Sequence, residues 1–140
     1  MKILKQYIPN GTRHKLLFTS YHAEGVNFVD MSALLARAIE SSLSNRNLPF
    51  VAEEELEKII KENVCHSSEI GDYIAIRNIG ILFEPALRLD LHAKFSTWSK
   101  AYVLIVDSAE GTIQMNIFYL AGDTDYSCTI NLSDISYNIH

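Results

Sequence analysis

The chain has 140 residues, of which 48% are hydrophobic and 21% are charged, and its formal net charge is −5 at pH 7. A chain of this size fits one domain that buries roughly two thirds of its unfolded surface. The acidic balance disfavours a nucleic-acid binder, because such proteins gain affinity from Lys and Arg at phosphates. We therefore expect a single domain over residues 1–140 that does not bind nucleic acid directly.

The first residues, MKILKQYIPNG, contain no long apolar run. We expect neither a secretory signal nor a membrane span, and interpret the chain as cytoplasmic. Cys65 and Cys128 lie far apart and lack CxxC spacing. This spacing favours two free thiols over a disulfide framework, each in a small buried apolar position.

Residues 1–13 read as an apolar arm and a turn, and we expect them to dock on the core. Residues 15–20 and 25–30 each have the pattern of a short strand. Only four residues, 21–24, separate these strands, whereas two adjacent parallel strands need a crossover of about a dozen residues. The two strands are therefore either antiparallel neighbours or belong to different parts of the sheet.

Two helices are predicted next. Asp30 or Ser32 can cap the first helix, which runs to Arg46 with an apolar stripe at four-residue spacing. The second helix follows Pro49, and glutamates at 53–55 in its first turn favour the helix dipole. Its apolar face repeats with a helical period and consists of Ala52, Leu56, Ile59, Ile60 and Val64.

Residues 73–83 are almost continuously apolar, which is typical of a strand buried on both faces in the middle of a sheet. A helix then begins either at Pro85 or with Asp90 as its N-cap. Its stripe of Leu91, Phe95 and Trp98 is expected to face the sheet. Residues 101–106 form the next predicted strand.

The last third alternates turns and strands. We expect turns at 110–111 and 122–125 and strands at 112–120 and 127–132. These strands would form an antiparallel C-terminal meander at the edge of the sheet. The predicted fold is therefore α/β, with a mixed, mostly parallel sheet, two to three helices and this meander.

A nucleotide-binding domain of this class would carry a glycine-rich phosphate loop after its first strand. Residues 21–25 read YHAEG, with one glycine and no lysine. A phosphate loop needs glycines that let backbone N–H groups converge on phosphate oxygens, and a lysine that reaches the terminal phosphates. We therefore expect no NTP hydrolysis and assign no catalytic residue and no cofactor.

The phrase NIGILFEPALRLD at 78–90 carries a family resemblance. It resembles the small P-loop protein of BREX-type phage-exclusion systems over 26–132, most clearly over 78–106. The matching residues are Asn78, Ile79, Leu82, Phe83, Pro85, Leu87, Leu89 and Asp90. The resemblance implies a phosphate loop after 16–20 and a magnesium-associated acid near Arg77, and this chain has neither. It therefore implies a degenerate P-loop-like three-layer domain.

Three polar residues near the first turn could form a metal or acid–base site, because His22, Glu24 and Asp30 place an imidazole beside carboxylates. No HxH or HExxH spacing supports metal binding, and a solvated turn explains them more simply. His92 lies on the flank of its helix, and the acidic turn at 123–125 lacks the regularly spaced oxygens of a calcium loop. We assign no metal site.

Cys65 and His66, close to Glu69 and Asp72, could suggest a thiol nucleophile with a base. Adjacent residues seldom present both groups to one substrate, and Cys65 continues the apolar face of the second helix. We interpret Cys65 as a core residue and His66 as exposed.

The sequence points instead to a partner-binding surface near its C-terminal end. Tyr119, Tyr126 and Tyr137 offer amphipathic contact area of the kind enriched in interfaces. The strand at 127–132 could complete a partner's sheet, or pair with itself in a homodimer. The first hypothesis is a non-catalytic, partner-binding accessory subunit of a bacterial phage-defence or mobile-element system. The alternatives are an acidic immunity or inhibitor protein that caps a toxin or nuclease, and, third, a nucleotide- or metal-dependent hydrolase.

Overall fold

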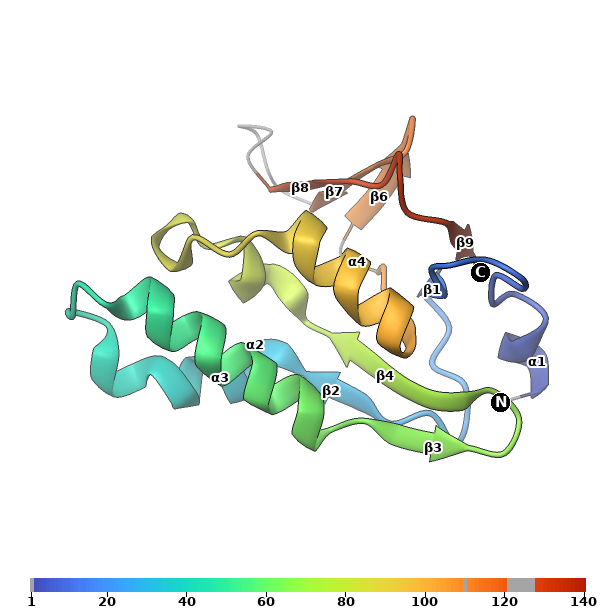
Figure 1. The fold of residues 1–140 in the computed structure, drawn as a ribbon, viewed down its shortest axis with the longest axis horizontal. Helices are drawn as coiled ribbons and strands as arrows, with labels where there is room; N and C mark the ends of the chain where they lie inside the picture. Colours follow the sequence, from blue (N-terminus) through green and yellow to red (C-terminus); the bar gives the residue numbers. More distant parts are fainter. Residues whose placement is uncertain (1, 110, 121–127) are drawn as a thin grey trace.

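A mostly parallel sheet forms the centre of the protein, whose computed structural model describes residues 2–109, 111–120 and 128–140 (Figure 1). In this sheet A, five parallel strands lie in the order β2-β4-β5-β1-β9, and β3 pairs antiparallel with β4. The strands of sheet A are β1 (Leu16–Thr19), β2 (Phe28–Asp30), β3 (Cys65–Ser67), β4 (Gly71–Arg77), β5 (Val103–Asp107) and β9 (Tyr137–Ile139).

The helices and the segment after β1 cover the two faces of sheet A. The helices are α1 (Lys2–Lys5), α2 (Met31–Ile39), α3 (Leu48–Glu62) and α4 (Leu91–Ala101), and the short 3₁₀ turns are η1 (Glu40–Ser42), η2 (Ile79–Phe83) and η3 (Pro85–Leu87). Alternate strand residues such as Leu16 and Phe18 pack against α2, α3 and α4 in the larger core. Leu17, on the opposite face, packs with Leu4 of α1 and with Ala23. The predicted docking of the N-terminal arm is thus confirmed.

Three further strands form sheet B, which is antiparallel in the order β6-β7-β8. They are β6 (Gly111–Gln114), β7 (Ile117–Leu120) and β8 (Thr129–Asn131). Phe118 of β7 stacks on Phe18 of β1 at 5.5 Å and on Phe83 at 6.2 Å, and so anchors sheet B to the main core. The predicted α/β class and antiparallel C-terminal meander are confirmed, but the meander forms its own sheet rather than the edge of sheet A.

Aspartates begin two of the helices. Asp30 accepts a hydrogen bond from the backbone N–H of Ala33, and Asp90 accepts one from Ala93. Each side chain satisfies an N–H group that has no partner inside the helix. Asp90 is therefore the N-cap of α4, whereas Pro85 starts only the 3₁₀ turn η3.

Several element boundaries differ from the prediction. The strand predicted at 73–83 ends at Arg77, because Asn78 adopts a left-handed backbone with φ 55° and the chain turns into η2. The helix predicted to reach Arg46 ends at Ile39, and η1 follows it. Burial of Tyr73 and the three residues after it, in the middle of sheet A, agrees with the predicted central strand.

The strand predicted at 112–120 is a hairpin. Gln114 pairs with Ile117, and the two residues between them, Met115 and Asn116, both have left-handed backbones with φ 51° and 62°. A two-residue turn with two positive φ values matches the twist of antiparallel strands. A bulky residue at positive φ costs roughly 1–2 kcal/mol. Methionine is therefore not a typical turn residue, and the sequence pattern did not predict this turn.

The C-terminal end holds a strand that the sequence patterns did not predict, the expected burial of the cysteines needs correction, and one predicted turn lies outside the described residues. The tail at 133–140 contains β9, which pairs parallel with β1. Cys65 and Cys128 are only partly buried, and do not have the buried positions that were predicted for them. The predicted turn at 122–125 lies outside the described residues. No described helix is long and apolar enough to span the hydrocarbon core of a membrane.

The first two strands lie in different parts of sheet A, which agrees with one of the two predicted arrangements. β5 and β4 separate β1 from β2, and both strands run in the same direction. The connection at 20–27 packs on the sheet face, where Ala23 is only 5% exposed. A short loop thus covers part of this face, where a crossover helix is more usual.

Candidate functional site

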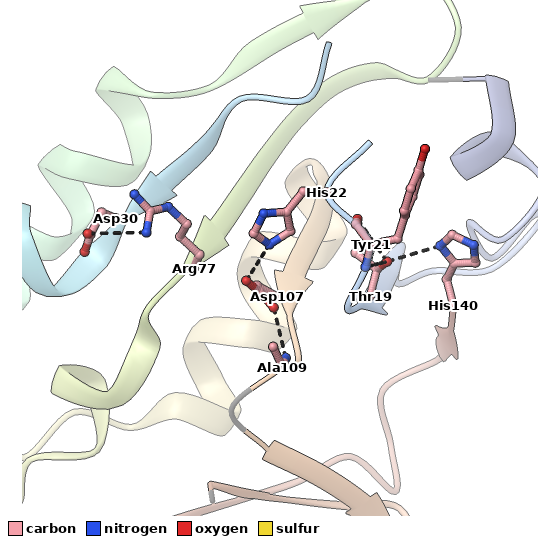
Figure 2. Close-up of polar contacts among 8 residues, drawn as sticks. All are labelled: Thr19, Tyr21, His22, Asp30, Arg77, Asp107, Ala109 and His140. Carbon is pink, nitrogen blue, oxygen red and sulfur yellow. Dashed lines mark hydrogen bonds and ion pairs between the residues drawn. The ribbon is translucent and has the colours of Figure 1, made fainter. Parts of the chain in front are cut away.

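The carboxyl ends of the parallel strands gather polar side chains along one edge of sheet A (Figure 2). Thr19 ends β1 in register with Asp107 of β5, and Asp30 ends β2 in register with Arg77 of β4. In open α/β sheets, ligands bind outside this edge. We therefore take it as the candidate site. Figure 2 shows that its polar contacts fall into three separate groups along the edge.

His22 and Asp107 form the central group. The His22 Nε2 atom lies 2.6 Å from Asp107 Oδ2, and Asp107 Oδ1 accepts a hydrogen bond of 2.9 Å from the backbone N–H of Ala109. The His22 ring also stacks on Phe28, with 4.6 Å between ring centroids. The Asp107 side chain is 13% exposed and that of His22 is 52% exposed. Both oxygens of a mostly buried carboxylate are thus in use.

Asp30 organises the second group. Its Oδ1 atom accepts hydrogen bonds of 3.0 Å from the Ala33 N–H and 3.1 Å from the Asn78 side-chain amide, while Oδ2 lies 3.6 Å from Arg77 Nη1. The backbone N–H of Ala33, then Asn78 and Arg77, lower the pKa of Asp30 below its ordinary value of 3.8. Ser32 donates from Oγ to the carbonyl of the left-handed Asn78 at 2.8 Å. Asp30 is therefore held as a carboxylate that ties α2 to the end of β4.

Thr19 and His140 form the third group. Thr19 Oγ1 accepts a hydrogen bond of 3.0 Å from the Tyr21 N–H and lies 3.1 Å from His140 Nδ1. The His140 ring stacks on Tyr7 at 4.2 Å and meets Tyr21 edge-on at 5.6 Å. Aromatic rings and an imidazole thus cover the buried hydroxyl at the end of β1.

The predicted trio of His22, Glu24 and Asp30 does not form one site through any described contact. His22 pairs with Asp107, and Asp30 serves the start of α2, while Glu24 is exposed. Within residues 2–109, 111–120 and 128–140, no group of three or more His, Cys, Asp or Glu side chains is placed to hold a metal ion. Sequence reasoning missed Asp107, because its partner lies 85 residues away. Its place at the end of an apolar strand was the available signal.

The side chains of Cys65 and His66, considered above as a thiol site, make separate contacts. The Cys65 Sγ atom lies 3.6 Å from the carbonyl of Asn63, while the exposed His66 lies 2.9 Å from Asp72, opposite it in the β3–β4 pair. His92 pairs with Asp134 at 2.6 Å on the surface. These histidines make surface pairs. His66 is exposed as predicted, but Cys65 lies at the border of the smaller core and is only partly buried.

The tyrosines of the predicted partner surface belong to different elements. Tyr137 in β9 packs edge-on against Phe18 at 6.0 Å and donates a hydrogen bond of 2.8 Å to Asn116 Oδ1. Tyr119 lies in β7, the middle strand of sheet B, and is partly buried. Tyr126 lies outside the described residues. Tyr137 thus connects the edge of sheet A to the tip of the β6–β7 hairpin.

Comparison of the chain with protein-family models, with curated proteins and with solved structures finds no match.

Proposed function

We propose that this protein is a non-catalytic domain that acts by binding a protein partner. One observation carries the proposal: the polar groups at the carboxyl edge of sheet A are engaged by the protein's own side chains. Asp30, Asp107 and Thr19 all have side-chain partners within the protein at 3.1 Å or less. A ligand at this edge would have to displace those partners and replace their hydrogen bonds.

The charges along this edge also oppose a nucleotide. A phosphate site uses free backbone N–H groups at the start of a helix. The first helix after the first two strands is α2, and the carboxylate of Asp30 already occupies its N-terminus. With the histidines counted as neutral, Asp30, Asp107 and the paired Arg77 give this edge a net charge of −1, which would repel an incoming phosphate.

The cellular setting is proposed from the family resemblance, which favours an accessory subunit of a bacterial phage-defence or mobile-element system. The net charge of −5 favours the alternative, an acidic immunity or inhibitor protein. Such a protein would use charge complementarity to speed its association with a basic toxin or nuclease. Neighbouring genes separate the two settings: large ATPase and methyltransferase genes support the first, and an adjacent toxin gene supports the second.

A thermal-shift series tests the non-catalytic proposal. The purified protein is heated with ATP or GTP, each with magnesium and with EDTA. A ligand that binds the folded state raises the unfolding midpoint. We therefore expect all four samples to have the midpoint of the protein without nucleotide. A rise of several degrees that disappears with EDTA would contradict the proposal.

The His22–Asp107 pair supports a second candidate function, a hydrolase. An aspartate that accepts a hydrogen bond from one imidazole nitrogen leaves the other nitrogen to take a proton from water. The 2.6 Å separation and the half-exposed His22 ring fit this role. The test is a panel of p-nitrophenyl carboxylic and phosphate esters. Turnover that is abolished by His22→Gln, with folding intact, would favour the enzyme over the binding domain.

A further inference from the structure

A pocket of about 330 Å³ lies at the amino ends of the central strands of sheet A. Its lining includes Lys15, which precedes β1, Ile70, which precedes β4, and Val103, which begins β5. These three strands are parallel, so the pocket lies at the edge opposite to the candidate site. Residues 5–10 complete the lining, and Figure 1 shows α1 beside the turn between β3 and β4 at the right of the view.

The backbone around this pocket is anchored. Leu4 of α1 is fully buried in the smaller core, and the Tyr7 carbonyl accepts a hydrogen bond of 2.7 Å from the side chain of Asn138. On the other side, the Lys15 N–H donates a hydrogen bond of 2.9 Å to the carbonyl of Ser99 at the end of α4. The pocket is therefore bounded by backbone that the fold holds in place.

Glu69 is the acidic residue of the pocket. Its Oε2 atom is shielded from water and has no hydrogen-bond partner, and no other side-chain atom in the described part of the chain is in this situation. A carboxylate oxygen that is out of water and lacks a donor destabilises the folded state. A cationic donor that entered the pocket would therefore stabilise this carboxylate.

Two lysines give the same pocket the means to bind an anion. Lys5 and Lys15 are exposed, and no described ion pair joins either of them to Glu69. Two ammonium groups and one carboxylate give the lining a formal charge of +1, although the whole chain carries −5. The pocket thus offers positive charge for an anionic group and a separate acceptor for a cationic group.

The rest of the lining limits the size and character of the ligand. Ile8, Ile70 and Val103 supply apolar surface next to the charged groups. Ligand pockets range over roughly 300–1,000 Å³, so this one lies at the small end and suits a single small metabolite. The complementary molecule has an anionic group, a cationic donor and a small apolar part.

We propose that this pocket binds a free α-amino acid with an apolar side chain. The carboxylate of the amino acid binds Lys5 and Lys15, its ammonium group donates to Glu69, and its side chain contacts Ile70 and Val103. A simple carboxylate or a simple amine would satisfy only one of the two charged groups. The inference goes beyond the proposed function and does not depend on it, because the pocket and the carboxyl edge lie at opposite ends of the strands.

Thermal shift and calorimetry on the whole chain test the proposal. The protein is heated with each standard amino acid at about 10 mM, and the amino acids that raise the unfolding midpoint are titrated by calorimetry. We expect saturable binding that is tightest for an apolar amino acid such as leucine. The analogues 4-methylpentanoate, which lacks the ammonium group, and 3-methylbutylamine, which lacks the carboxylate, should each bind at least about tenfold more weakly than leucine.

Variants assign each charged group of the ligand to its partner. Glu69→Gln keeps the size of the side chain and should weaken leucine binding by about tenfold or more, but leave 4-methylpentanoate binding within about threefold. Lys15→Met should weaken the binding of both carboxylates and leave 3-methylbutylamine binding unchanged. Glu62→Gln and Lys61→Met, at exposed positions of α3, are matched controls that should bind leucine as the wild type does.

Three results would overturn the proposal. The pocket is not an amino-acid site if no amino acid raises the midpoint or binds in calorimetry. Equal affinity of the wild type for leucine and for either analogue would show that one of the two charged contacts is not made. Binding of inorganic phosphate as tight as that of leucine would make the pocket a general anion site. The analogues and phosphate are tested on the wild type, so these results do not depend on the folding of a variant.

Discussion

Removing the carboxylate of Asp30 tests how strongly the carboxyl edge of sheet A is held together. Asp30 caps α2 and also binds Asn78 and Arg77. The side chain of Asp90, which caps α4, accepts a hydrogen bond from the backbone N–H of Ala93. Loss of an N-cap costs about 1 kcal/mol. The hydrogen bond to Asn78 contributes about another 1 kcal/mol, and the partly exposed contact with Arg77 less than about 1 kcal/mol.

We therefore expect Asp30→Ala to lower the free energy of unfolding by about 2–3 kcal/mol, and Asp90→Ala by about 1 kcal/mol. Urea denaturation at pH 7 measures both values, and equal m-values would show that the two variants unfold from comparable states. The pKa of Asp30 lies below 3.8, so its contribution is present above that pH and is lost as the pH falls through the lowered pKa. Equal losses of stability for the two variants would refute the reasoning, because Asp30 would then act only as a helix cap.

Four further predictions concern the core, the pH dependence and the two polar pairs. Trp98 is 2% exposed, so Trp98→Ala should cost about 3–5 kcal/mol in urea denaturation, and the wild-type indole should emit at the short wavelengths of a dry environment. Burial lowers the pKa of His14 below 6.5, so folding should lose stability as the pH falls from 6.5 toward that lowered pKa, and His14→Gln should remove this loss in pH-dependent melting. Tyr137→Phe deletes the exposed hydrogen bond to Asn116 and should cost about 0.5–1 kcal/mol; a larger loss would mean that β9 detaches. His22→Ala should change the free energy of unfolding by less than about 1 kcal/mol, because its ring is half exposed, and a loss of several kcal/mol would contradict this reading.

Elements with a regular apolar period could be predicted from the sequence. The face that includes Leu56 and Ile60 repeats with a helical period, and α3 is a helix over Leu48–Glu62. Its ends differ from the prediction: the helix starts early enough that Glu53 lies beyond its first turn, and Val64 lies past its C-cap. The apolar run from Tyr73 gives the central strand β4, but the pattern cannot show where it ends. The left-handed Asn78 stops the strand, and the apolar residues after it form η2 instead.

Long-range pairing could not be predicted from local patterns. β9 has three residues and is held by long-range contacts, above all by pairing with β1 across more than a hundred residues. The His22–Asp107 contact likewise depends on the connection at 20–27 lying on the sheet, which its own polar sequence does not specify. The hairpin tip was hidden for another reason, because Met115 occupies a position where turn rules expect Asn, Asp or Gly.

Backbone amide NMR during a titration with ATP and magnesium tests most directly the claim that the carboxyl edge of sheet A is closed by its own side chains. The amides of Tyr21, Ala33 and Ala109 donate hydrogen bonds to Thr19, Asp30 and Asp107, and so report on all three groups along the edge. The account predicts that their chemical shifts stay constant up to millimolar nucleotide. Saturable, magnesium-dependent shifts centred on these three amides would show that the edge opens to a nucleotide, and would contradict the account.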